Sequence, residues 1–103
     1  MTTERANKDF ARIIAENGFT ATDKTTYDGS QIYSRTWSHE VQVAWYGDRT
    51  STLEIQMWIS FGYPMVRIIR SGRPEDKLRN YSSPKRAINA IHEIVRIAGF
   101  EAA

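Results

Sequence analysis

The sequence has no cysteine, which excludes disulfide bonds, thiolate metal ligands and a cysteine nucleophile. It has no apolar run approaching the roughly 20 residues that span a bilayer. The charged side chains within residues 1–20 exclude a signal peptide, and no low-complexity tract interrupts the 103 residues. These absences predict a soluble, cytoplasmic protein that folds as one domain over residues 1–103 and has no membrane partner.

Motifs for catalysis and metal binding are missing as well. There is no HExxH, no cluster of carboxylates and no G-x-S-x-G elbow. The two histidines are far apart, with His39 in a predicted turn and His92 beside a helical apolar stripe. The sequence therefore predicts no metal, no cofactor and no enzymatic activity. A metal-free ribonuclease is the minor alternative, since acid–base catalysis needs only suitable side chains held together. Its residues would be Arg35, His39, Glu40 and Arg67.

Charge is spread unevenly along the chain, although the net charge is only +2. Residues 1–60 carry six Lys/Arg and eight Asp/Glu, whereas residues 61–103 carry eight Lys/Arg and four Asp/Glu. A basic surplus of this kind attracts polyanions, but it also occurs on ordinary solvated surfaces. Both explanations stay open at this point.

Two helices are predicted at the ends of the chain. The first begins at Thr2 or Thr3 and ends at Gly18, which can take a left-handed conformation while Phe19 folds back onto Ile14. The second helix follows "SSP", with Ser83 as its N-cap and Pro84 in its first turn. It ends with the same Gly-Phe pair, at residues 99 and 100.

Between the helices the spacing of apolar residues changes from 3.6 to 2, which is typical of strands. Strands are predicted at 31–37, 40–46, 52–61 and 65–71, with an irregular one within 20–30. The short connections favour antiparallel neighbours. We therefore predict an α+β two-layer sandwich, with an antiparallel meander of three to five strands and both helices on one face.

The strand at 52–61 raises a question about the other face of the sheet. Its apolar side would pack under the helices together with Val41, Val43 and Trp45. Trp58 then lies on the second face, where we expect Tyr46 and also place Trp37 and Arg35. Tryptophan, tyrosine and arginine are enriched at binding hot spots.

Three explanations fit this aromatic second face. The segment at 71–83 or at 20–30 could cover the rings, the face could associate with a second copy or another protein, or it could stack bases of single-stranded nucleic acid.

The segment 70–86 carries most of the basic surplus and is predicted to be a long loop. It leads to the start of the last helix, where free N–H groups and the helix dipole favour an anion. The candidate nucleic-acid-binding residues are Arg70, Arg73, Lys77, Arg79, Lys85 and Arg86.

Two families resemble parts of the chain. "SSPKRAINAI" is similar to the start of the final helix in double-stranded-RNA-binding domains, and that resemblance implies phosphate contacts by Lys85 and Arg86, supported by Lys77 and Arg79. "ENGFTATDKTTYDGSQIY" resembles the corresponding region of HicA-type toxins, which share the helix–meander–helix order. Where those toxins have a catalytic histidine this chain has Gln31, so the resemblance implies the fold and not nuclease chemistry.

The sequence thus predicts a small non-catalytic module that binds nucleic acid or another polyanion through the basic segment and helix start. The alternative is a protein-interaction or self-associating module, such as a phage-type regulator, that docks through the Trp58 and Tyr46 face.

Overall fold

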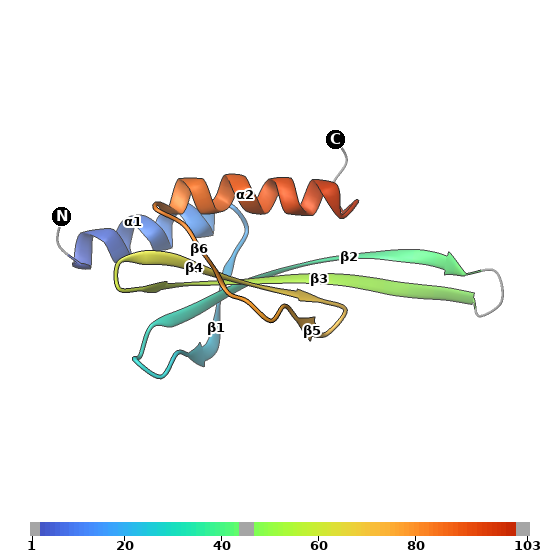
Figure 1. The fold of residues 1–103 in the computed structure, drawn as a ribbon, viewed down its shortest axis with the longest axis horizontal. Coiled ribbons are helices and arrows are strands. Elements are labelled where there is room, and N and C mark those ends of the chain that lie inside the picture. The colour runs from blue at the N-terminus through green and yellow to red at the C-terminus, as the bar shows by residue number, and fades with distance from the viewer. Residues whose placement is uncertain (1–2, 44–46, 101–103) are drawn as a thin grey trace.

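The computed structural model describes the backbone of residues 3–43 and 47–100 and the side chains of residues 8–38 and 51–100. Two helices lie on the same side of an antiparallel sheet (Figure 1), so the predicted α+β arrangement is confirmed. The strands follow the order β1-β2-β3-β4-β5, and β6 also pairs with β4. The elements are α1 (Thr3–Glu16), β1 (Thr20–Thr25), β2 (Gln31–Val43), β3 (Gly47–Ser60), β4 (Tyr63–Arg70), β5 (Arg73–Pro74), β6 (Arg79–Asn80) and α2 (Pro84–Ile97).

Both helices end as their sequences predict. Gly18 has φ 82°, and the N–H of Phe19 donates to the carbonyl of Ile14 at 3.0 Å. At the end of α2 the N–H of Phe100 donates to the carbonyl of Val95 at 3.1 Å. The returning aromatic residue satisfies a carbonyl that the helix leaves open and packs its ring on the core. Neither described helix is long and apolar enough to span a bilayer.

The core lies between the helices and one face of the sheet. Leu53, Ile55 and Met57 of β3 are fully buried there, which confirms that the alternation in this strand marks its inner side. The other buried members of this cluster come from both helices and from β2 and β4. They are Phe10, Ile14, Phe19, Trp37, Val66, Ile68, Ala87, Ile88, Ile91 and Val95.

The predicted turn at residues 37–40 is wrong, because β2 is one continuous strand. Its pairing with β3 runs without a break from Tyr33 opposite Met57 to Val43 opposite Gly47. No glycine or proline interrupts residues 31–43, so nothing in that stretch breaks an extended backbone. The two predicted strands at 31–37 and 40–46 therefore belong to one strand as far as Val43, and it pairs with β3 in one long ribbon; residues 44–46 lie outside the described ones.

This ribbon extends past the end of α2 (Figure 1). Val41 and Val43 pair with Arg49 and Gly47 in this ribbon, and their side chains lie outside the described ones, so the expectation that they pack beneath the helices stays a prediction. Trp45, which was expected there too, lies outside the described residues. The irregular strand expected within 20–30 is β1, and its register with β2 shifts between Ala21 and Thr25.

Candidate nucleic-acid interface

The basic segment 70–86 is not the free loop that its sequence predicts. After a turn it runs back along the edge of β4, pairing first through β5 and then through β6. Between and after these pairs, the N–H of Glu75 donates to the carbonyl of Ile68 at 2.8 Å and that of Tyr81 to the carbonyl of Pro64 at 3.0 Å. The backbone that carries the cations is therefore held at repeated points along the sheet edge.

The cations of this edge fall into two groups. Arg70 and Arg79 share a single acid, since their Nη2 atoms lie 3.5 and 3.3 Å from the carboxylate oxygens of Glu75. Among the described residues, no acidic side chain pairs with the other four candidates within 4.0 Å. These unpaired cations, all exposed, are Arg73, Lys77, Lys85 and Arg86. The structure thus places all six predicted residues along one edge and around the start of α2, with four of them available for contact.

The start of α2 has fewer free N–H groups for binding an anion than the sequence suggests. Ser83 is the N-cap, and its side-chain oxygen accepts the N–H of Arg86 at 3.2 Å. Pro84 has no N–H, and the N–H of Ala87 donates to the carbonyl of Ser83 at 3.1 Å. Of the N–H groups usually left open at a helix start, one is missing at Pro84 and one is capped at Arg86, so fewer remain for an anion. A phosphate at this point would rely on the side chains of Lys85 and Arg86.

The second sheet face does not present the aromatic surface that was expected. Trp58 does lie on that face, but it is only 6% exposed. The guanidinium carbon of Arg67 lies 5.4 Å from the centre of its ring, and Met65 is its partner on β4. Of the three explanations for this tryptophan, burial within the chain is the one that its exposed fraction supports. Tyr46, the other expected contact on that face, lies outside the described residues.

Trp37 and Arg35 were assigned to the wrong face. Arg35 pairs with Ile55 and Trp37 with Leu53, and directly paired residues point to the same side, so both side chains face the helices. There the Nη1 of Arg35 donates to the carbonyl of Asn17 at 2.8 Å, and its guanidinium lies 4.5 Å from the ring centre of Trp37. The arginine satisfies a carbonyl at the end of α1, where a cation also suits the helix dipole.

This assignment separates the residues of the ribonuclease alternative. Arg35 faces the helices, whereas Arg67, which pairs with Gln56, points from the opposite face of the sheet. The side chains of His39 and Glu40 lie outside the described ones. Among the described residues, no group of three or more histidine, aspartate or glutamate side chains could hold a metal ion.

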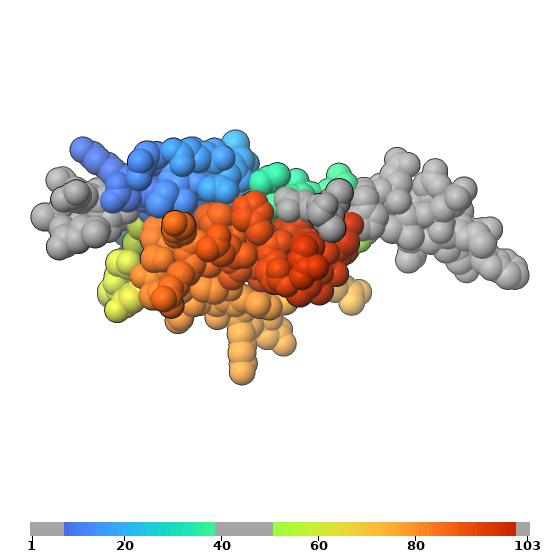
Figure 2. Space-filling view, turned by 90° about the horizontal axis from the view of Figure 1, so that it is seen from above, coloured from blue at the N-terminus to red at the C-terminus, as the bar shows by residue number. Residues whose placement is uncertain are grey.

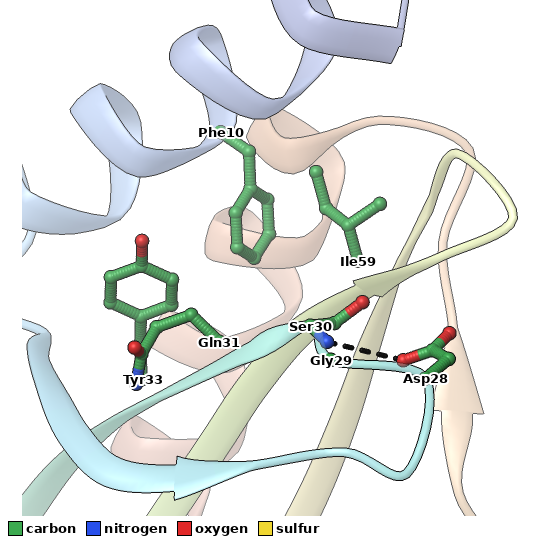
Figure 3. A pocket seen from close by; sticks show the side chains of 7 residues that line it. All are labelled: Phe10, Asp28, Gly29, Ser30, Gln31, Tyr33 and Ile59. Atoms are coloured by element: carbon green, nitrogen blue, oxygen red, sulfur yellow. Dashed lines mark hydrogen bonds between the residues drawn. The ribbon is translucent and has the colours of Figure 1, made fainter.

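A hollow of about 340 Å³ lies between α1 and the connection from β1 to β2 (Figure 3). Its lining includes Gln31, whose Nε2 donates to the carbonyl of Thr22 at 2.7 Å and so joins the two strands. The lining of this hollow also includes the carboxylate of Asp28, which accepts hydrogen bonds from the hydroxyl of Thr26 and, at 3.2 Å, from the N–H of Ser30. These bonds, with the one from Thr26 first, lower the pKa of Asp28. Both side chains therefore serve the turn and the strand pairing.

The sequence analysis missed an aromatic group at the tip of the β3–β4 hairpin. A hollow of about 660 Å³ lies there, lined by Ser60, Phe61, Tyr63, Met65, Asn80, Tyr81 and Ser82. Phe61 is 91% exposed and Tyr63 56% exposed. The available signal was "FGYP", in which phenylalanine occupies a two-residue hairpin turn that usually prefers asparagine or aspartate before glycine.

A neighbouring hollow of about 290 Å³ connects this tip to the start of α2. Its lining includes Gly62 of the hairpin turn, Ser82, Lys85 and also Asp9 of α1. Ser82 lines both hollows. The space-filling view shows the hairpin tip (yellow-green) beside the first turn of α2 (orange) (Figure 2). Exposed aromatic rings and the basic helix start thus form one end of the molecule.

In comparisons with known proteins, no family model, no curated protein and no solved structure matches this chain. What the interface binds is therefore inferred from its own chemistry.

Proposed function

We propose that this protein is a non-catalytic module that binds nucleic acid or another polyanion along the edge formed by β5, β6 and the start of α2. The observation that carries the proposal is the group of four unpaired cations, Arg73, Lys77, Lys85 and Arg86, described above. Unpaired, exposed cations gain most from phosphate, because binding releases the counterions condensed on the nucleic acid.

The fixed course of this edge also supports binding. A flexible basic loop loses conformational freedom when it engages a ligand, and that loss lowers affinity. Here the hydrogen bonds to β4 already order the backbone on both sides of Lys77. Cationic residues on an edge strand can also serve to prevent the sheet from pairing with another sheet. The dependence of nucleic-acid affinity on salt is therefore needed to distinguish phosphate binding from this protective role.

The alternative function, docking of a protein through the second sheet face, loses the anchor that the sequence assigned to it. Trp58 is buried, and a ring already covered within the monomer adds little further buried area to an interface.

The test is to measure the affinity for a fluorescent 12-nucleotide single strand at several salt concentrations. Four phosphate contacts predict that log affinity falls against log salt with a slope of about −3, at roughly 0.7 per contact. The double variant Lys85→Ala/Arg86→Ala should flatten the slope by about 1.4. The control variant Lys24→Ala/Arg96→Ala also removes two positive charges, one from β1 and one from the end of α2. It should leave the slope nearly unchanged.

Neither pair of substitutions touches a buried side chain, so both variants should fold. A salt-independent affinity, or an equal loss in the two double variants, would refute specific phosphate binding at this edge.

A further inference from the structure

Phe61 occupies a position that nothing within the described chain explains. Its φ of 51° lies in the left-handed region and is followed by φ 82° at Gly62, the pattern of a type I′ turn. A bulky residue is disfavoured in this conformation, and the ring gains almost no burial in return because 91% of it is exposed. Strained, exposed aromatic residues of this kind are found where a partner is bound.

Two further rings and a thioether complete the surface around Phe61. Tyr63 follows the turn, Tyr81 approaches from the far end of the basic segment, and Met65 lies on β4 beside Trp58. The volume of this hollow, about 660 Å³, is within the range of ligand-binding pockets. Its chemistry suits flat, partly apolar groups, which can stack on aromatic faces.

The charge around the hollow favours a ligand that is anionic and carries such flat groups. Lys85 lines the adjoining hollow, and among the described residues no acidic side chain pairs with it. The one acidic residue in the linings of the two hollows is Asp9, whose Oδ1 lies 3.8 Å from the Nη2 of Arg12. Aromatic faces beside an unpaired cation match a polymer that alternates bases with phosphates.

We propose that this aromatic hollow stacks unpaired bases of single-stranded nucleic acid while Lys85 holds a neighbouring phosphate. This inference rests on the proposed binding of nucleic acid and specifies which form is bound. Duplex bases are already stacked on one another, and their faces are out of reach. Exposed rings therefore favour single strands, loops and ends over double helices.

The test compares Phe61→Ala with Tyr27→Ala on the 12-nucleotide single strand and on a 12-base-pair blunt duplex. Tyr27 is fully exposed in the β1–β2 connection and lines none of the three hollows described here. Stacking predicts that Phe61→Ala weakens single-strand binding on the order of tenfold at every salt concentration, with an unchanged salt slope. Tyr27→Ala should bind as the unchanged protein does, and the duplex should bind more weakly than the single strand.

The remaining outcomes are distinguishable. Tight, salt-dependent binding of the duplex, with no loss in Phe61→Ala, would overturn base stacking and leave the proposed phosphate binding intact. No binding of either oligonucleotide would overturn both proposals. If Phe61→Ala instead abolishes self-association seen by light scattering and leaves oligonucleotide binding unaltered, the tip is a protein contact and the inference is wrong.

Discussion

Replacing Phe61 with asparagine should stabilise the protein. A residue with a Cβ costs roughly 1–2 kcal/mol in the left-handed region, and asparagine is among the few that adopt it readily. The lost burial is small, because the ring is 91% exposed. About a tenth of a phenylalanine surface is roughly 20 Å², which is worth about 0.5 kcal/mol. The net gain expected for Phe61→Asn is therefore about 1 kcal/mol.

Urea denaturation at pH 7, followed by circular dichroism, measures this gain in the free energy of unfolding. The melting temperature should rise by about 4–8 °C for a domain of this size. Phe61→Ala is the matched control, since alanine removes the ring but keeps a Cβ at φ 51°. Its stability should stay close to that of the unchanged protein. Loss of stability in Phe61→Asn would show that the ring packs within the chain, and the case for a partner at the tip would fail with it.

Three further changes test other parts of the structure. Trp58→Ala should lower the free energy of unfolding by about 3–5 kcal/mol in urea denaturation, because the ring is buried in the monomer. The oligomeric state measured by light scattering should not change. Near-native stability of this variant would support an exposed position for the ring. Ser83→Ala should cost about 1 kcal/mol by the same measurement, since it removes the cap of α2, and an unchanged midpoint would contradict that role. Asp28→Asn should be less stable than the unchanged protein at pH 7. The lowered pKa of Asp28 means that its stabilisation is complete above the unfolded value near 3.8 and disappears as pH falls through the folded value. A difference that does not shrink as pH falls below 3.8 would refute this assignment.

Local patterns allowed much of the fold to be predicted. The Gly-Phe ends of both helices, the Ser-Pro start of α2 and the inner side of β3 each depend on residues within a few positions of one another. Interactions of this range are encoded by short stretches of sequence. The six cations of the candidate interface were found in the same way, because they lie close together along the chain.

Pairing between strands decided what the sequence left undetermined. Alternation tells which residues of one strand share a side, but the register with the neighbouring strand sets which side faces the helices. That register placed Arg35 and Trp37 in the core layer, against expectation.

By itself, the sequence determined the helices, most of the strands and the positive charge of residues 70–86. Only the tertiary structure buried Trp58, aligned the basic segment on the edge of β4, and brought Tyr81 to Phe61 across twenty positions of chain. The physical reason is that hydrogen bonds between distant strands fix these contacts, and no local pattern specifies which distant residues will pair.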